Sequence, residues 1–191
     1  RGAADLRSAI DQLGLPMIVK PATQGSSVGM TKVERAEELQ PAYELAARHD
    51  ACVFAEPWIT GGEYTVGILQ GRALPSIRIE TPKSFYDYEA KYFRSDTRYL
   101  CPSGLDAMAE QRLAGLAIAA FDAVGAEGWG RVDFMMDRGG RPLLLELNTV
   151  PGMTDHSLVP MAARAAGIDF DLLVWRVLET SLVRTRAQAI R

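Results

Sequence analysis

The sequence predicts a mixed α/β (α+β) fold, because short apolar strands alternate with amphipathic helices along its 191 residues. The clearest signal is a hairpin, in which β-rich residues 129–137 and 142–148 flank the turn Arg138-Gly139-Gly140-Arg141. The second signal is a helix at residues 108–124, whose apolar side chains recur at helical spacing and which Gly125 ends. A chain of this length forms one globular domain or two small lobes.

The remaining elements follow from the same two patterns, the alternation of a strand and the helical spacing of apolar residues. The expected strands, all short and bounded by turn residues, are residues 17–21, 28–33, 51–56, 64–69, 73–80, 129–137 and 142–148. The expected helices are residues 5–13, 37–49, 108–124 and 170–185. Pro41 is compatible with the second helix only if it lies near the first turn. Gln70-Gly71-Arg72 predicts a tight hairpin between the fourth and fifth strands.

Residues 81–104 show no clean period. A stretch of this length exceeds the roughly 12–15 residues of an ordinary loop. It also carries several tyrosines and charged residues, among them Lys91 and Tyr92. We therefore expect a lid that closes over a bound substrate.

Composition and charge exclude several classes of protein. The chain is 48% hydrophobic and 24% charged, with a net charge of −3, so it offers no general field for nucleic acid or an anionic membrane. No apolar run approaches the roughly 18 residues of a membrane span, and the first residues lack a signal-peptide layout, which makes the cytosol the expected location. Cys52 and Cys101 are expected to be structural thiols, and His49 and His156 are too few and too distant to suggest zinc.

The hairpin carries acidic residues in the middle of its strands. If its loop is even, Asp133 pairs with Glu146 and Arg131 pairs with Asn148, and all four side chains project from one face. Two carboxylates opposite each other repel, and a divalent cation turns that repulsion into a binding site. Two carboxylates and an amide oxygen suit Mg²⁺ or Mn²⁺. The alternative is a solvated face on which Arg131 pairs with one of the acids.

A second cluster suits phosphate. Lys20 ends an apolar strand shortly before Gly25-Ser26-Ser27, which offers backbone N–H groups and two hydroxyls. The spacing is not that of a Walker loop, because the lysine precedes the glycine instead of closing the loop. Taken alone, these residues favour a plain β-hairpin turn that is rich in serine.

A third cluster suits a nucleoside. Glu56-Pro57-Trp58-Ile59 leaves a strand at a proline, so that backbone groups and an aromatic ring could receive a purine, and the carboxylate of Glu63 could accept from ribose. A strand end with a packed tryptophan is the alternative. In the lid, Lys91 and Tyr92 could approach a bound anion, although a loop lysine is usually solvated. Together the clusters indicate a magnesium nucleotide.

These segments resemble the ATP-grasp ligases, and within them the D-alanine:D-alanine ligase family. The segments that carry the resemblance occur in order over nearly the whole chain: residues 19–21, 25–29, 56–59, Glu63, 85–92, 128–133, 146–153 and 156–160. The resemblance implies an ATP-grasp fold of two α+β lobes with the nucleotide between them. Residues 14–81 would form the small lobe and residues 82–191 the large one, with the lid at 81–104. Residues 1–13 would lead in from an N-terminal domain that this chain lacks.

The resemblance also implies a reaction. ATP would phosphorylate the carboxylate of one D-alanine, and the amine of a second would attack the acyl phosphate to give D-Ala-D-Ala for peptidoglycan synthesis. The partners are then ATP and D-alanine, in a bacterial cytoplasm and in a homodimer of the full-length enzyme, with neither nucleic acid nor membrane. The alternatives are a fragment that binds Mg-ATP without turnover and a ligase with another acceptor, D-lactate or D-serine.

Residue roles follow by position from the same resemblance. The nucleotide would be held by Lys20, Ser27, Glu56, Trp58, Ile59, Glu63 and Lys91. Two Mg²⁺ ions, or Mn²⁺, would be held by Asp133, Glu146 and Asn148. Groups around the reacting atoms would be Arg131, Ser26, Tyr92 and the backbone of Gly152, and the second D-alanine would be received by Ser157 and Leu158. Tyr92 within Glu-Ala-Lys-Tyr favours the dipeptide product over D-alanyl-D-lactate.

Overall fold

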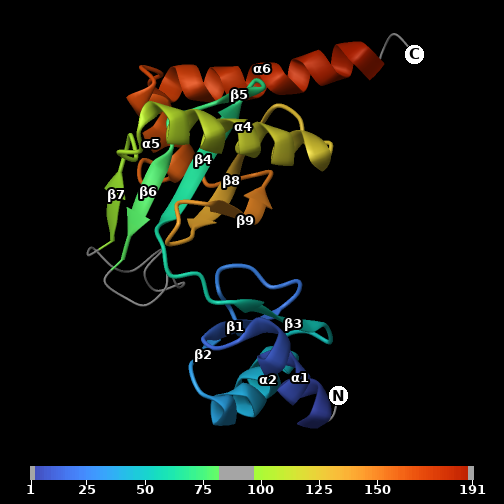
Figure 1. Cartoon of the computed structure of the whole chain (residues 1–191). Helices are drawn as coiled ribbons and strands as arrows, with labels where there is room; N and C mark the ends of the chain where they lie inside the picture. The colour runs from blue at the N-terminus through green and yellow to red at the C-terminus, as the bar shows by residue number, and fades with distance from the viewer. Residues whose placement is uncertain (1–2, 82–96, 189–191) are drawn as a thin grey trace. The chain divides into compact units, whose positions relative to one another are not determined.

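The chain forms two compact units in a computed structural model, which describes residues 3–81 and 97–188 (Figure 1). The first unit contains the residues up to Ile59, and the second contains Thr60–Glu80 and the residues from Thr97 onward. Each unit has its own sheet and its own hydrophobic core.

The first unit is a three-stranded antiparallel sheet with helices packed against it. Its elements are α1 (Ala3–Leu13), β1 (Met17–Pro21), β2 (Thr31–Val33), the 3₁₀ helix η1 (Ala36–Glu38), α2 (Leu39–Ala47) and β3 (Val53–Pro57), with strand order β2-β1-β3. Alternation along β1 directs Met17 and Val19 into the core with Leu39 of α2, while Ile18 and Lys20 project from the opposite face. One face of the sheet is therefore left to carry polar groups.

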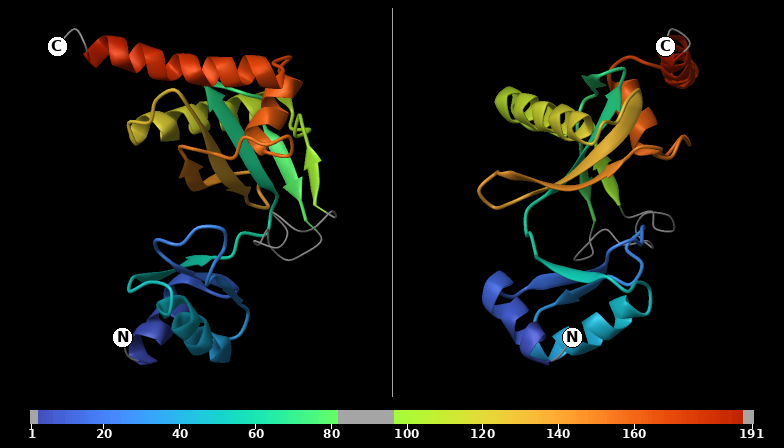
Figure 2. Two further views of the ribbon diagram at one scale, coloured as in Figure 1. Left: turned by 180° about the vertical axis from the view of Figure 1, so that it is seen from behind. Right: turned by 90° about the vertical axis from the view of Figure 1, so that its right-hand side faces the viewer.

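The second unit is a larger antiparallel sheet covered on both faces (Figure 2). Its strands are β4 (Glu63–Leu69), β5 (Arg72–Ala73), β6 (Ile77–Glu80), β7 (Arg98–Leu100), β8 (Trp129–Met136) and β9 (Pro142–Asn148), in the order β7-β6-β4-β8-β9 with β5 paired to β4. Its helices are α4 (Ala107–Ala123), α5 (Leu158–Ala165) and α6 (Phe170–Gln188).

Alternation along β4 divides the second unit into two cores. Val66 and Ile68 pack with Leu113 of α4, whereas Leu69 packs with Val159 of α5 on the other face. The face toward α5 also carries the functional side chains described below. No helix in the described part of the chain is both long and apolar enough to cross a membrane.

Most of the expected elements are present, and several boundaries differ. Pro41 lies in the first turn of α2, as expected. Gln70 and Gly71 have φ angles of 51° and 72° and form the two-residue turn between Leu69 and Arg72. The expected strand 73–80 is instead two strands, because Leu74-Pro75-Ser76 interrupts the pairing. Cys52 is exposed just before β3 and is not inside a strand.

Two elements were missed. Helix α5 was not expected, and the end of the supposed lid contains β7, which pairs with β6 through Arg78↔Leu100. Residues 98–100, which were expected to lack regular structure, therefore form a strand. Residues 82–96, which include Lys91 and Tyr92, lie outside the described residues.

The expected division of the chain at residue 81 also differs from the structure. Strands β4 and β6, which were assigned to the small lobe, belong to the second unit because β4 pairs with β8 along its whole length, from Glu63↔Met135 to Leu69↔Trp129. The opening helix is part of the first unit, since Ile10 packs against its core.

Candidate active site

The acidic hairpin has the pairing that the sequence predicted at its polar positions. Asp133 lies opposite Glu146, and Arg131 lies opposite Asn148. The premise of an even loop was nevertheless wrong. The loop 137–141 has five residues, and next to it Phe134 pairs with Leu144. A bulge between Asp133 and Phe134 then shifts the register of the two strands. The extra residue in the bulge offsets the odd loop, so the polar pairs are aligned.

The turn of the hairpin is held by one aspartate. The Asp137 carboxylate accepts hydrogen bonds from the backbone N–H groups of Gly139 and Arg141, both at 2.9 Å, and from Arg141 Nε at 3.1 Å. The hydrogen bond from the Arg141 backbone is the largest cause that lowers the pKa of Asp137 below its ordinary value. Asp137 therefore holds the closed end of the hairpin, away from the polar pairs.

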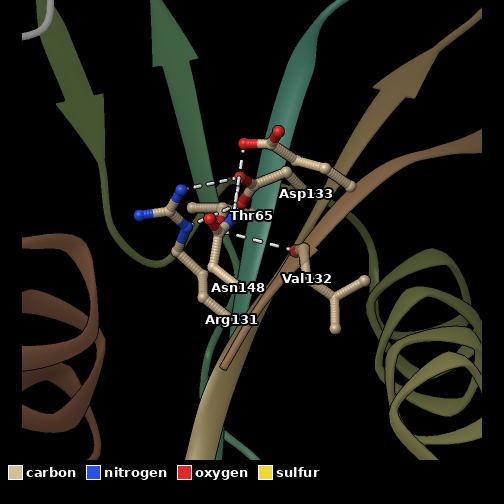
Figure 3. Close-up of polar contacts among 6 residues, drawn as sticks. Thr65, Arg131, Val132, Asp133 and Asn148 are labelled. Atoms are coloured by element: carbon tan, nitrogen blue, oxygen red, sulfur yellow. Dashed lines mark hydrogen bonds and ion pairs between the residues drawn. The ribbon is translucent and has the colours of Figure 1, made fainter. Parts of the chain in front are cut away.

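The Asp133 carboxylate is at the centre of a hydrogen-bonded cluster (Figure 3). Asp133 is only 6% exposed. Its Oδ1 accepts from Thr65 Oγ1 at 2.6 Å and from Arg131 Nε at 2.8 Å. Its Oδ2 accepts from Arg131 Nη2 at 2.7 Å and from Asn148 Nδ2 at 3.1 Å. The same Asn148 nitrogen is 3.3 Å from Glu146 Oε1, so it bridges the two carboxylates.

The cluster combines features of both interpretations of the hairpin. The Arg131–Asp133 ion pair is present, but it is mostly buried and is not a solvated surface pair. The donor set of two opposed carboxylates and an amide suits a hard divalent cation. No group of three or more His, Cys, Asp or Glu gathers among the residues that the structure describes. The side-chain oxygens that this cluster offers to a cation belong to Asp133, Glu146 and Asn148.

The loop after β9 folds back onto the start of α5. Ser157 is the N-cap residue of α5, and its Oγ accepts from the Thr154 N–H at 2.9 Å. A Cβ at Gly152 would lie 2.9 Å from Ser157 Oγ, so the expected catalytic backbone at Gly152 is close to the expected substrate residue Ser157. Leu158 is the first residue of α5 and is partly buried. Backbone N–H groups at a helix N-terminus favour anions such as a carboxylate.

Two of the nucleotide-type residues, Lys20 and Glu56, lie on the same face of the sheet in the first unit. Lys20 forms an ion pair with Glu56 and lies 5.6 Å from the ring centroid of Phe54. The Trp58 N–H donates to Pro16 O at 3.0 Å. The sequence suggested that this backbone donor could bind a purine, but it is already used. Lys32, which sequence reasoning missed, lies 5.0 Å from the ring centroid of Trp58. Ile59 ends the first continuous stretch of the unit.

The serine loop has an unusual backbone. Ser26 and Ser27 have positive φ angles of 54° and 62°, a region that non-glycine residues adopt at a cost of roughly 1–3 kcal/mol each. The surrounding segment is held by Asp50, which accepts from the Thr23 N–H at 2.7 Å and from the Thr23 hydroxyl at 2.5 Å. Asp50 also accepts from the Cys52 N–H at 2.8 Å. Strain retained in a supported loop favours a binding role over an ordinary turn.

Two further residues complete the face of the second unit. Glu63 and Thr65 alternate with the buried Tyr64, so their side chains lie on the face that carries Asp133. Glu63 was expected as a contact to ribose, whereas Thr65 was given no role. The Glu-Tyr-Thr-Val alternation at the start of β4 was the signal that could have indicated it.

Solved structures with the same arrangement define the class of protein. VanG D-Ala:D-Ser ligase from Enterococcus faecalis superposes with a TM-score of 0.83 at 32% identity, covering 93% of this chain and 52% of that chain. D-alanine–D-alanine ligase from Bacillus anthracis superposes with a TM-score of 0.82 at 38% identity, covering 96% of this chain and 59% of that chain. The fold is therefore the ATP-grasp fold that these ligases share.

Sequence comparison gives the family. The family model described as D-ala D-ala ligase C-terminus matches residues 3–179. The D-alanine–D-alanine ligase of Alkalilimnicola ehrlichii is 62% identical over 178 residues, and that of Nitrosococcus oceani is 60% identical over 176 residues. These matches cover 93% and 92% of this chain but only 57% and 56% of the relatives. The chain belongs to the D-alanine–D-alanine ligase family and corresponds to its C-terminal part.

Proposed function

We propose that the protein to which this chain belongs is an ADP-forming D-alanine:D-alanine ligase, which joins two D-alanines through an acyl phosphate. The observation that carries the proposal is the cluster of Arg131, Asp133, Glu146 and Asn148 on one face of the β8–β9 hairpin. The family membership and the neighbouring structure described as complexed with ATP, at 33% identity and a TM-score of 0.79, support the same conclusion.

Asp133, Glu146 and Asn148 would hold Mg²⁺ or Mn²⁺. Two ions at this position would neutralise the phosphates of ATP and stabilise the phosphoryl group in transfer. The protein contributes the geometry: Asp133 is fixed by Thr65 and Arg131, and Asn148 lies within hydrogen-bonding reach of both carboxylates. Fixed, partly buried groups of this kind need little reorganisation when charge develops.

Arg131 and the start of α5 would orient the two D-alanine substrates. A guanidinium carries a planar set of donors and stays charged, which suits an oxyanion on the reacting carboxyl carbon. The Gly152 backbone would add a donor there, and Ser26 and Tyr92 would join the network around the substrates. Ser157 and Leu158, at the N-terminus of α5, would receive the carboxylate of the second D-alanine.

The contacts to the nucleotide are proposed residue by residue from the family. From the first unit, Lys20 and Ser27 would contact phosphate, while Glu56, Trp58 and Ile59 would contact adenine. From the second unit, Glu63 would bind ribose on the face that carries Asp133. Lys91 would reach the γ-phosphate. The product would serve peptidoglycan synthesis in the cytoplasm, and the full-length enzyme would be a homodimer.

The proposal is tested by phosphate release from ATP in the presence and absence of D-alanine, together with ATP binding. The measurement is made on this 191-residue chain and on a protein of the full length of its relatives. We expect D-alanine-dependent release from the longer protein and a D-Ala-D-Ala product. ATP binding without any D-alanine-dependent release from either protein would contradict the ligase function.

A panel of acceptors tests the choice of substrate. The D-Ala:D-Ser ligase among the structural neighbours makes D-serine the competitor that most needs comparison. D-alanine, D-serine and D-lactate are each supplied with ATP and D-alanine, and the products are identified by mass. We expect D-Ala-D-Ala to form with the highest kcat/KM, and a higher value for either other acceptor would overturn that substrate.

A further inference from the structure

We propose that Thr65 is a positioning residue for the candidate cation site: it anchors Oδ1 of Asp133 and so directs Oδ2 toward the cation. The inference rests on the proposed function, in which Asp133 is a cation ligand. Neither the resemblance nor the family match assigned a role to Thr65.

The hydrogen bonds divide the two oxygens of the carboxylate. Oδ1 accepts from Thr65 of β4 and from Arg131 Nε of β8. Oδ2 is the oxygen next to Asn148 Nδ2, which in turn reaches Glu146 Oε1. Asn148 therefore connects Glu146 to Oδ2 and not to Oδ1, while Arg131 Nη2 is the second donor to Oδ2.

Thr65 is well suited to be the fixed partner. It is 1% exposed and sits directly opposite Asp133 in the β4–β8 ladder. A β-branched side chain on a strand has few accessible rotamers, so its hydroxyl cannot easily follow a moving carboxylate. Its 2.6 Å hydrogen bond to a carboxylate is in the range of short charge-assisted bonds.

The other donors to Asp133 are better able to rearrange. A carboxylate offers about four lone-pair positions, and the four donors named above occupy them. A cation at Oδ2 must displace a donor there. Rotation of the Asn148 amide would replace Nδ2 by its oxygen. Thr65 would then hold the carboxylate while its Oδ2 partners exchange.

The experiment measures Mn²⁺ binding to the full 191-residue chain by electron paramagnetic resonance, with Thr65→Val as the main variant. Valine keeps the shape of threonine and removes the hydroxyl. We expect Mn²⁺ to bind about tenfold more weakly, since loss of a partner that orients a metal ligand typically costs about 10- to 100-fold in affinity. Thr65→Ser, which restores the hydroxyl, should bind within about twofold of the unaltered chain.

Ser76→Ala is the matched control. Ser76 is also a 1% exposed hydroxyl of the second unit, and it donates to a carboxylate, Glu110, at 2.5 Å. This variant should lose thermal stability without changing Mn²⁺ affinity. If Thr65→Val does not fold, Thr65→Ala provides a second hydroxyl-free variant for the same measurement.

Asp133→Asn separates failure of this inference from failure of the proposed function. Unchanged Mn²⁺ affinity in Thr65→Val, together with a large loss in Asp133→Asn, would overturn the role of Thr65 and leave the cation site intact. Unchanged affinity in both variants would remove the cation site itself. Weaker binding in Thr65→Val that Thr65→Ser does not rescue would also overturn the role, because the methyl packing and not the hydroxyl would then be responsible.

Discussion

Asp133 has two roles that a substitution can separate. It is the acceptor for Thr65 and Arg131, and it is the proposed cation ligand. Its neighbour in the hairpin, Asp137, is also multiply hydrogen-bonded but lies at the turn, away from the polar pairs. Comparing the two aspartates distinguishes structural from functional loss.

Asp133→Asn should abolish most Mg²⁺-dependent turnover of the full-length enzyme while the protein still folds. Asparagine keeps the shape of the side chain but removes the charge. The loss in kcat should therefore exceed the roughly 10- to 100-fold loss that follows when a residue that only orients a metal ligand is removed. Loss of the charge-assisted hydrogen bonds should lower the free energy of unfolding by about 2 kcal/mol. Asp137→Asn serves as the control, and turnover and thermal unfolding are the measurements. Equal loss of turnover in both variants would contradict the assignment.

Arg131→Gln should strengthen cation binding although it abolishes turnover. The guanidinium neutralises Asp133 in the ion pair, and its removal leaves two opposed carboxylates without that charge. We expect Mn²⁺ to bind up to about tenfold more tightly. The repulsion between two unit charges 4 Å apart is roughly 4 kcal/mol at an effective dielectric constant of 20, which is more than enough to account for this gain. Calorimetric titration measures it, with Arg141→Gln as the control from the same hairpin. Weaker binding in Arg131→Gln would show that the arginine supports the cation site.

The sequence was sufficient to identify Asp133 and Glu146 as candidate site residues, but it was not sufficient to identify Thr65. Carboxylates in the middle of apolar strands are costly without a partner, so Asp133 and Glu146 indicate a site by themselves. Threonine is common in strands, and its contact with Asp133 joins residues 68 positions apart. Only the pairing of β4 with β8 brings them together.

At the scale of elements, the hairpin shows how a correct pairing can come from an incorrect premise. The sequence indicates alternation and a turn, but a bulge leaves no composition signal of its own. Helix α5 was missed for a related reason: it has only eight residues and contains Pro160 in its first turn. Short elements depend more on their packing than on their own pattern.

The segment around the serine loop depends on a carboxylate that titrates at low pH. The pKa of Asp50 is lowered, chiefly by the hydrogen bond from the Thr23 side chain. A carboxyl whose folded pKa lies below its unfolded value stabilises the fold above the unfolded pKa, about 3.9, and loses that contribution as the pH falls through the folded value. Asp50→Asn should therefore destabilise the first unit near neutral pH and by progressively less below about pH 4.

Thermal unfolding between pH 2.5 and pH 7 tests this prediction. The unaltered chain and the variant should converge at the acidic end. Asp11→Asn, an exposed aspartate of α1 in the same unit, is the control. A difference between Asp50→Asn and the unaltered chain that is the same at every pH would contradict the role of the charge.

At the scale of the whole molecule, the two lobes that the sequence predicted have other bounds than the two compact units. A strand that follows another closely in sequence is often its neighbour, which made a lobe of residues 14–81 reasonable. Strand β4 instead pairs with β8, more than 60 residues later. Long-range pairing of this kind decides the division, and local periodicity carries no information about it.

The separation of the cores predicts how the chain unfolds. Each described core cluster lies within one unit: Met17, Val33 and their neighbours in the first, and Leu113 and Val159 with theirs in the second. Chains of more than one domain depart from two-state unfolding. We therefore expect two transitions in urea, with Met17→Ala lowering the midpoint of one and Leu113→Ala that of the other, each by the equivalent of about 2–5 kcal/mol.

Tryptophan fluorescence can follow the two transitions separately. Trp58 lies in the first unit, and Trp129 and Trp175 lie in the second. A variant with Trp129→Phe and Trp175→Phe reports the first unit alone, and Trp58→Phe reports the second. The core substitutions should then each move only the curve of their own unit, because the removed methylene groups contact only that core. Coincident curves that move together in both core variants would mean that the two units unfold as one cooperative structure.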